Sequence, residues 1–429
     1  MNKHGMVRAV DTHFEFEDGT IFHPFGTTVY ALAHQTEELI EQTLKTLENS
    51  PFNKVRMCVF PKHYTYNNND PLYYPFEKRE DGSWDVRKPV AEFWNNLDSI
   101  ITRLDEAEIQ CDLILFHPYD CWGFANMPQA DNLIYIDYVV ERLAYHKNLW
   151  WSVANEYDLC LGYKTMEDWY EIEEYLAAKD PYHHLLSCHN CFVLWDFHRE
   201  AITHGSIQNR TIAQVANQVN EFKKPIVVDE CCYEGNIPDN WGCISGEEMT
   251  ARFWESIVSG AYCTHGETFL DDKDVLWWAK GGTLKGESPK RIAWLKELVD
   301  TFPKNMEPIT EEIVGIANMP REQREEMGNS PMLKGFMAAM ERMSEKDRMI
   351  GLFFEKNYEG CIGKDIFLYF YEHHCNALAN ITLPVDASYK VEVLDTWNMT
   401  RKVIMTHVNG NVSVNLPGRE YMAILATRE

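Results

Sequence analysis

Eight short apolar runs, each followed by a longer segment with the periodicity of an amphipathic helix, make up the N-terminal part of this 429-residue chain. Such an alternation is typical of βα units around a parallel sheet. Eight units in about 280 residues predict an α/β fold of the (β/α)₈, or TIM barrel, type, whose usual size is about 250 residues or more. The predicted strands are residues 21–30, 54–60, 110–117, 149–155, 185–190, 203–208, 225–230 and 261–267.

Amphipathic helices are predicted between these strands, at residues 36–48, 90–107, 133–146, 212–222, 246–258 and 288–302. The first of them has Thr36 as its N-cap, because a threonine side chain accepts a hydrogen bond from a free N–H of the first turn.

The pattern changes after residue 303. Residues 306–348 are rich in methionine and charged residues, and we expect a linker or helical insertion there. Strand-like runs return at residues 350–354, 365–371, 389–394, 400–406, 412–416 and 421–425, with Asn409-Gly410 as a tight turn. The chain is therefore predicted to have three parts: a barrel with a short N-terminal β cap (1–305), the charged insertion (306–348) and a small antiparallel β-sandwich (349–429).

The charge of the chain narrows the choice of partners. It has 40 Lys and Arg against 66 Asp and Glu, for a net charge of −26, which argues against binding to nucleic acid or to an anionic membrane. The first residues contain no apolar segment of a signal peptide, and no stretch of about 18 apolar residues suggests a membrane span. The 12 cysteines are scattered, as in proteins of reducing compartments. We therefore expect a cytoplasmic protein.

Polar side chains are concentrated where the predicted strands end. In (β/α)₈ barrels the active site lies at the C-terminal ends of the strands, whatever the reaction. A purely structural strand does not need this polarity. The residues concerned are Arg56, His117, Asn155, Glu156, His189, His204, Glu230, His265 and Glu267.

Two glutamates are the sharpest of these features. Glu156 follows the apolar run Trp150-Trp151-Ser152-Val153-Ala154-Asn155, and Glu230 closes the run Pro225-Ile226-Val227-Val228-Asp229. They end the fourth and seventh predicted strands, so both side chains are able to reach one barrel mouth. Hydrolysis of a glycosidic bond requires such a pair, one carboxylic acid to protonate the leaving oxygen and one carboxylate to attack or to activate water. The alternative is that both are ion-paired residues of the barrel rim.

These residues resemble those of the cellulase-like barrel glycoside hydrolases of clan A, which include cellulases, mannanases and β-galactosidases. The resemblance covers about residues 10–303. Asn155-Glu156 resembles the acid/base motif of the clan and Glu230 its nucleophile, while Arg56, His117 and His189 resemble its second-, third- and fifth-strand residues. The segments VDECCYEGNI, THGETF, VLDTWNMT and LPGREYMAIL look like those of a bacterial group of candidate glycoside hydrolases with a C-terminal β domain. The resemblance implies a retaining double displacement.

Roles follow from the surroundings expected for each residue. Glu156 is expected to be the general acid/base, with a pKa raised by apolar surroundings or by the neighbouring Glu230 carboxylate. Arg56 is expected either to keep the nucleophile Glu230 ionised or, as a structural residue, to tie the layers of the barrel together. Asn155 is expected to donate to a sugar 2-hydroxyl. His117 and His189 either bind substrate or are buried, hydrogen-bonded residues of the core. Asp229 and Glu234 are alternative nucleophiles.

The chain also departs from the pattern of the clan. The sixth strand lacks the usual aromatic residue beside the nucleophile and offers His204 or Gln208 instead. The eighth strand ends in His265-Gly266-Glu267 rather than in a tryptophan, so Glu267 becomes a third carboxylate for a sugar hydroxyl. Trp278, in the loop that follows, is the best candidate for stacking on a sugar ring.

The sequence thus predicts a retaining glycoside hydrolase that acts, in an exo fashion, on short oligosaccharides or glycosides. Cys188 and Cys191 have no second CxxC pair, so neither a metal nor a cofactor is predicted. Two alternatives remain: a catalytically inactive carbohydrate-binding barrel, and another TIM-barrel enzyme such as an aldolase-type lyase or a metal-dependent hydrolase. The sugar, its anomer, the linkage and the oligomeric state stay open.

Overall fold

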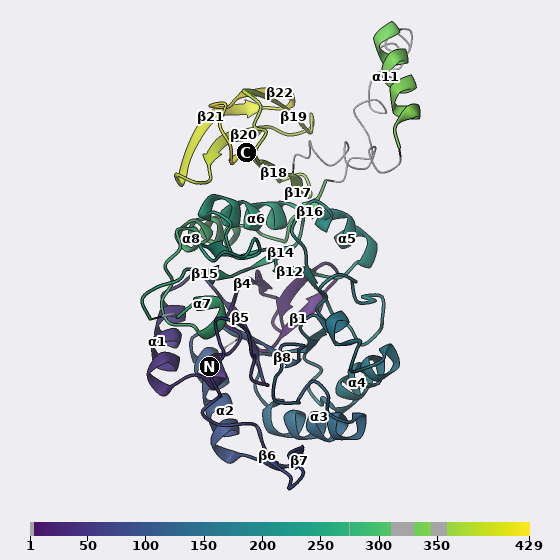
Figure 1. Cartoon of the computed structure of the whole chain (residues 1–429). Helices are drawn as coiled ribbons and strands as arrows, with labels where there is room; N and C mark the ends of the chain where they lie inside the picture. Colours follow the sequence, from purple (N-terminus) through teal and green to yellow (C-terminus); the bar gives the residue numbers. More distant parts are fainter. Residues whose placement is uncertain (1–3, 274, 310–329, 345–357) are drawn as a thin grey trace. The chain divides into compact units, whose positions relative to one another are not determined.

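The computed structural model of the chain describes residues 4–273, 275–309, 330–344 and 358–429 (Figure 1). It divides into two compact units. Unit 1 comprises Met1–Met306 with Asp395–Thr400, and unit 2 comprises Glu307–Leu394 with Arg401–Glu429.

Unit 1 contains a sheet of eight parallel strands in the spatial order β10-β9-β8-β5-β4-β14-β12-β11. A parallel bridge between His189 and Ser206 joins the two edge strands, which curls the sheet into a nearly closed barrel. The predicted (β/α)₈ fold is therefore confirmed. The strands are β4 (Phe25–Thr28), β5 (Lys54–Cys58), β8 (Gln110–Phe116), β9 (Leu149–Ala154), β10 (Leu185–Ser187), β11 (Gly205–Gln208), β12 (Ile226–Glu230) and β14 (Tyr262–His265).

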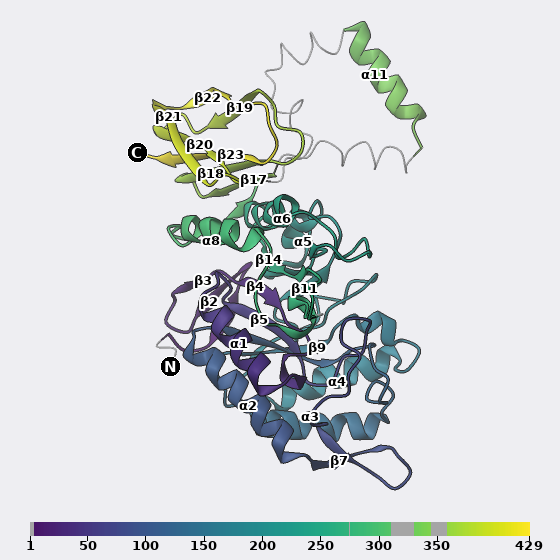
Figure 2. The ribbon, with the colours of Figure 1, turned by 60° about the vertical axis from the view of Figure 1, so that its left-hand side comes forward.

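Helices surround the strands on the outside (Figures 1 and 2). Thr36 caps the first helix as predicted, by accepting a hydrogen bond from Leu39 N, and the apolar stripe of Ile40, Leu44 and Leu47 is buried. The sequence analysis missed α4 and α7. The helices are α1 (Glu37–Glu48), α2 (Ala91–Glu106), α3 (Gln129–Leu143), α4 (Met166–Lys179), α5 (Val215–Phe222), α6 (Gly246–Val258), α7 (Trp277–Lys280) and α8 (Ser288–Val299), with short 3₁₀ turns η1 (Leu32–His34) and η2 (Tyr157–Cys160).

Unit 1 also contains short strands outside the eight-stranded barrel sheet. The predicted N-terminal β cap is an antiparallel sheet of β1 (Val7–Val10), β2 (His13–Phe16) and β3 (Ile21–Phe22), so the predicted strand 21–30 is in fact two strands, β3 and β4. A hairpin of β6 (Phe76–Lys78) and β7 (Trp84–Pro89) lies in the connection after β5. Beyond the seventh and eighth barrel strands, β13 (Glu234–Gly235) pairs with β15 (Glu267–Thr268).

Unit 2 has two sheets, one of six strands in the order β16-β17-β18-β23-β20-β21 and one of β19 and β22. Alternate residues of both sheets, such as Phe367, Tyr389, Ile381 and Val414, share one core, which is the arrangement of a sandwich. The strands are β16 (Glu307–Pro308), β17 (Tyr358–Ile362), β18 (Ile366–Tyr371), β19 (Leu378–Leu383), β20 (Tyr389–Asp395), β21 (Thr400–Val408), β22 (Gly410–Asn415) and β23 (Met422–Arg428).

Three sequence predictions for this part of the chain have different outcomes. Asn409-Gly410 does join two strands, with Gly410 at φ +66°, but β21 and β22 lie in different sheets, so the turn is not a hairpin. The predicted strand 350–354 lies outside the described residues. Of the predicted insertion, the structure describes the helix α11 (Pro331–Arg342).

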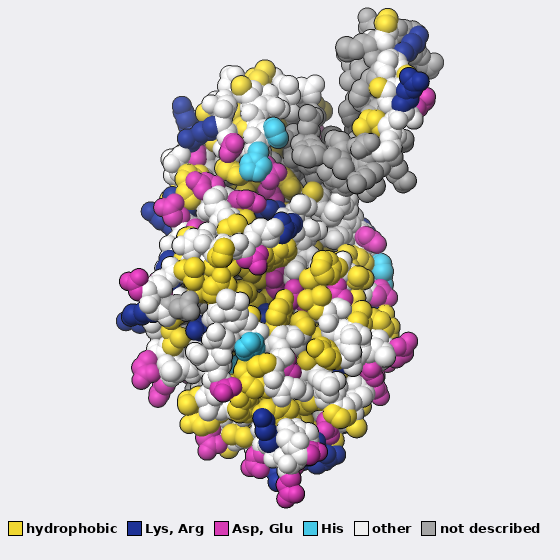
Figure 3. All heavy atoms as spheres, viewed as in Figure 1, with side chains coloured by type: hydrophobic (Ala, Val, Ile, Leu, Met, Phe, Trp, Pro, Cys, Tyr) yellow, Lys and Arg dark blue, Asp and Glu magenta, His cyan; other side chains and the backbone are white. Residues whose placement is uncertain are grey.

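Among the described residues, no helix is long and apolar enough to cross a membrane. Acidic side chains are spread over the surface seen in Figure 3 and are not gathered in one patch.

Candidate active site

A pocket of about 380 Å³ opens where the barrel strands end. Its walls come from residues at or just after the C-terminal ends of six strands: Tyr30, Lys62, Tyr119, Glu156, Gln208 and Glu230. Aromatic side chains from the loops complete it, namely Tyr64, Tyr66, Tyr233, Trp241 and Trp278. The pocket therefore lies where a (β/α)₈ barrel carries its chemistry.

Glu156 is held in an unusual backbone conformation directly after β9. Its φ and ψ are +52° and +53°, a left-handed conformation that costs a non-glycine residue of the order of 1–3 kcal/mol and that clusters at functional sites. Its backbone N–H donates to His189 Nδ1 at 3.4 Å, and Asn155 Nδ2 donates to its Oε2 at 3.2 Å. Burial raises the pKa of Glu156 and the neighbouring Glu230 carboxylate raises it further, while Lys62 and a hydrogen bond from Tyr119 act in the opposite direction.

Glu230 is the last residue of β12 and faces Glu156 across the pocket. The hydroxyl of Tyr30 contacts Glu230 Oε1 and lies 3.1 Å from Asn155 Oδ1. With its amide nitrogen turned toward the carboxylates, Gln208 donates to Glu156 Oε1 and to Glu230 Oε2 at 3.2 Å each. One nitrogen thus bridges both carboxylates, so these two oxygens are no farther apart than twice that distance. The Gln208 alternative for the sixth strand is the one that reaches the pair.

Arg56 does not pair with Glu230, and of its two predicted roles the structure supports the structural one. Its guanidinium is completely buried inside the barrel, where Nη1 lies 3.0 Å from both Asp112 Oδ2 and Asp229 Oδ2. Lys54 Nζ contacts the same two aspartates at 2.7 Å. Burial opposes the ionisation of Asp229, but Arg56 and Lys54 outweigh it and hold its pKa far below the usual range. Asp229 is therefore part of a buried ionic network and not an alternative nucleophile.

Asn155 is used inside the protein. Its Oδ1 accepts from Arg56 Nη2 at 3.1 Å and its Nδ2 donates to Glu156. Its side chain is buried and is absent from the described pocket wall, so the structure does not show the predicted reach to a sugar hydroxyl. The residue connects the ionic network to the carboxylate pair.

His117 and His189 are buried core residues beside the pocket. His117 Nε2 is 3.1 Å from the carbonyl of Phe60, and burial lowers its pKa to about 3, which makes it neutral. Burial also places the pKa of His189 well below its ordinary value, so its Nδ1 is free to accept from the backbone of Glu156. Of the two readings of these histidines, the structure favours the buried, hydrogen-bonded one, because neither lies in the described pocket wall.

His204 lies at the wrong end of the barrel to bind substrate. It precedes β11, whose first residue is Gly205, and its ring packs against Phe14 and Trp150 at centroid distances of 5.6 and 5.4 Å. The sequence prediction took it for a residue of the strand end, whereas it stands at the strand start. His265 does end β14, but its ring stacks on Phe52 at 4.7 Å, away from the pocket wall.

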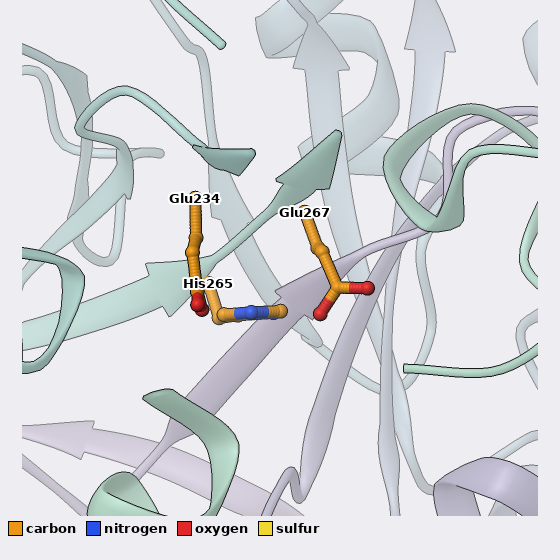
Figure 4. A group of neighbouring side chains, drawn as sticks. All are labelled: Glu234, His265 and Glu267. Atoms are coloured by element: carbon orange, nitrogen blue, oxygen red, sulfur yellow. The ribbon is translucent and has the colours of Figure 1, made fainter. Parts of the chain in front are cut away.

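Glu267 is also not a pocket residue, contrary to the prediction. It lies next to Glu234 and His265, and these three side chains each offer one atom of the kind that binds metals, all within 4.8 Å of one another (Figure 4). Both carboxylates are already occupied by the loop before α8: Glu267 accepts from the N–H groups of Lys285 and Gly286 at 2.5 and 2.7 Å. Burial raises the pKa of Glu267 to about 7.

Glu234 also accepts hydrogen bonds from this loop, from the two residues that follow Gly286. It accepts from Glu287 N at 2.7 Å and from Ser288 Oγ at 2.5 Å, at the first residue of α8. A carboxylate at a helix N-terminus is stabilised by the free N–H groups there, so Glu234 acts as a helix cap and not as a nucleophile.

Trp278 lines the pocket as predicted, with its ring 4.8 Å from that of Tyr64 and 5.4 Å from that of Tyr233. The pocket residues that the sequence analysis missed include Tyr30, Lys62, Tyr119 and Tyr233. Each follows the end of a barrel strand by two to four residues. That position was the signal available in the sequence, but aromatic residues are common throughout this chain.

Comparisons with known proteins agree with this geometry. Residues 10–311 match the family of apiosidase-like catalytic domains, and residues 356–427 match a domain of unknown function (DUF5605). No curated protein matches the chain.

Solved structures extend the comparison. A candidate glycoside hydrolase from Bacteroides vulgatus ATCC 8482 is 31% identical, with a TM-score of 0.83, over 100% of this chain and 83% of that one. A family 5 glycoside hydrolase of the same organism shares the fold, with a TM-score of 0.71 at 14% identity, over 99% of this chain and 94% of that one. The chain belongs to the family of apiosidase-like catalytic domains, and it is a glycoside hydrolase with the barrel of the cellulase-like clan.

Proposed function

We propose that the protein is a retaining glycoside hydrolase in which Glu230 is the nucleophile and Glu156 the general acid/base. The bridge that Gln208 forms between the two carboxylates carries this proposal. Retaining enzymes hold their carboxyl groups about 5–5.5 Å apart, whereas inverting enzymes leave about 6.5–9.5 Å for a water molecule. Two oxygens that share one amide donor fit the shorter spacing.

The chemistry follows from the protonation of the pair. The raised pKa of Glu156 favours a protonated acid, which donates to the glycosidic oxygen as the bond to the anomeric carbon breaks. Glu230 Oε forms a bond to that carbon, which gives a glycosyl-enzyme. A water molecule then attacks the same carbon, passes its proton to Glu156 and releases Glu230. Tyr30 holds Glu230 in place for both displacements.

The pocket supports action on short, neutral sugars. Its volume is at the small end of the usual range for ligand pockets, about 300–1,000 Å³. Flat aromatic walls such as Trp241 and Trp278 suit the apolar faces of sugar rings. We propose exo action on oligosaccharides or glycosides, because the pocket is lined on several sides. The substrate is proposed to be a neutral glycan, which a net charge of −26 does not repel.

The cysteines support a cytoplasmic location. All 12 are free, and the sulfur atoms of Cys231 and Cys263, 3.6 Å apart, share a hydrogen bond and not a disulfide. Buried thiols so close together persist where the surroundings are reducing.

The test is turnover of a panel of aryl glycosides by the wild type, Glu156→Gln and Glu230→Gln. We expect Glu230→Gln to lose about 10⁴-fold or more in kcat, and Glu156→Gln to lose about 10²–10⁴-fold on substrates with poor leaving groups. Azide added to Glu230→Gly is expected to restore turnover and to give a glycosyl azide of inverted configuration. Near-wild-type turnover by either glutamine variant contradicts the role of that residue. Sugar binding without any turnover favours an inactive carbohydrate-binding barrel.

A further inference from the structure

Lys62 is a buried cation in the wall of the pocket. It follows β5 by four residues, and only 2% of its surface is exposed. Its Nζ lies 3.3 Å from the ring centroid of Tyr30 and 4.4 Å from that of Tyr119. Among the described residues no hydrogen bond or ion pair holds this ammonium, so the ring faces are its protein contacts.

The other buried cations near the pocket are already neutralised. Arg56 and Lys54 contact Asp112 and Asp229, two cations against two carboxylates. Among the described residues, Lys62 is therefore the one lysine or arginine of the pocket wall that Glu156 and Glu230 share, and both carboxylates act on it electrostatically. A site with one cation and two carboxylates has no net charge when one of the carboxylates carries a proton.

We infer that Lys62 is a positioning residue of the reaction: its ammonium, seated on the face of Tyr30, holds the pair of Glu156 and Glu230 in the state that carries one negative charge. This inference rests on the proposed function. Tyr30 connects Lys62 to Glu230, because its hydroxyl contacts the Glu230 carboxylate while its ring face contacts the Lys62 ammonium. A cation on the ring face draws electron density from the phenol and strengthens its hydrogen bond to the carboxylate.

The same charge serves both displacements. Before the first, Glu230 is the anion and Glu156 is neutral. In the glycosyl-enzyme, Glu230 has become an ester and Glu156 the anion. Lys62 therefore faces one negative charge throughout the cycle, and no charge has to be buried or exposed as the reaction proceeds.

The neighbouring titratable groups do not change the net charge of the site formed by Lys62, Glu156 and Glu230. Burial raises the pKa of the Cys58 thiol to about 12 and raises the pKa of Tyr30, Tyr64 and Tyr119, so these groups are neutral. Beside Glu156, burial raises the pKa of Cys191 to about 12, so its thiol is neutral as well. Burial lowers the pKa of Lys62 itself, and the two carboxylates oppose that change.

The test is the pH dependence of kcat/KM on an aryl glycoside for the wild type, Lys62→Met and Lys62→Arg. The acid limb of this profile reports the first ionisation of the carboxylate pair in the free enzyme. We expect the limb of Lys62→Met to move about one unit toward higher pH, and that of Lys62→Arg to stay in place because the charge is kept. The rate at which a 2-deoxy-2-fluoro glycoside labels Glu230 is expected to follow the same pH shift.

Lys164 provides a matched control. It is also a buried lysine over aromatic rings, 5.3 Å from Phe116 and 5.8 Å from Trp169, but its Nζ donates to the carbonyl of Ala125 and it is not in the pocket wall. Lys164→Met is expected to leave the acid limb where it is.

The outcomes separate the two proposals. An active Lys62→Met whose acid limb coincides with that of the wild type overturns the role of Lys62 alone. Wild-type enzyme without turnover or labelling contradicts the proposed function, and the inference falls with it. If Lys62→Met does not fold, as judged by its Tm, Lys62→Gln replaces it with the same expected shift.

Discussion

The ionic network under the pocket makes the sharpest prediction about stability. Asp229 lies 2.7 Å from Lys54 Nζ and 3.0 Å from Arg56 Nη1, and all three side chains are fully buried. At an effective dielectric constant of about 20, each of these contacts is worth about 6 kcal/mol of Coulomb energy. Much of this is offset by the cost of removing the charges from water. Asp229→Asn leaves two buried cations with a single aspartate, and we expect a loss of about 3–5 kcal/mol in the free energy of unfolding.

The assay is urea unfolding followed by tryptophan fluorescence. Twelve of the 13 tryptophans lie in the barrel part of the chain and Trp397 lies in the turn between β20 and β21, so the signal reports mainly the barrel. The control is Asp137→Asn, which removes an exposed ion pair with Lys179 at 2.8 Å and is expected to change nothing measurable. A loss below about 1 kcal/mol for Asp229→Asn refutes the reasoning, because breaking a buried pair leaves an uncompensated charge.

Two further predictions concern Tyr30, beside the carboxylate pair, and Glu267, outside the pocket. Tyr30→Phe removes the hydroxyl that contacts Glu230, and we expect kcat to fall about 10- to 100-fold, the usual worth of a hydrogen bond to a charged group, with KM little changed. Glu267→Gln tests a role in folding. The pKa of Glu267 is about 7 in the folded state against an ordinary value of 4.5, so its contribution to stability is full below pH 4.5 and is lost as the pH rises through 7. The variant is expected to unfold with a smaller pH dependence between these values and to keep kcat within about twofold; a large fall in kcat on a folded protein contradicts the structural role.

Much of the fold could be predicted from local pattern. Amphipathic helices such as α1 and α6 and the apolar barrel strands repeat a short-range periodicity that neighbouring residues impose, so their positions are readable in the sequence. Glu156 and Glu230 were found because they end two strands, and the parallel geometry brings such ends together. His204 was assigned to the wrong end of its strand, because a strand of four residues is too short for the sequence to show which end a flanking residue occupies.

The partners of charged residues could not be predicted in this way. Arg56 has two aspartates and two glutamates within the same barrel, and the sequence does not show which of them its guanidinium reaches. The inward direction of Asp112 and Asp229 decides it, and that direction depends on the tilt and register of strands far apart in the chain. Loop residues are harder still, because Lys62 and Tyr30 enter the pocket through turns that have no periodicity.

The sequence by itself therefore determined the barrel, the β-sandwich and the pair of glutamates at two strand ends, because these follow from periodicity and from the direction of parallel strands. The tertiary structure alone decided which cation serves that pair. Ion pairs form between side chains that the fold brings within a few ångströms. In this protein Arg56 contacts the buried aspartates, whereas Lys62 lies on the ring of Tyr30 in the pocket that also holds the two glutamates.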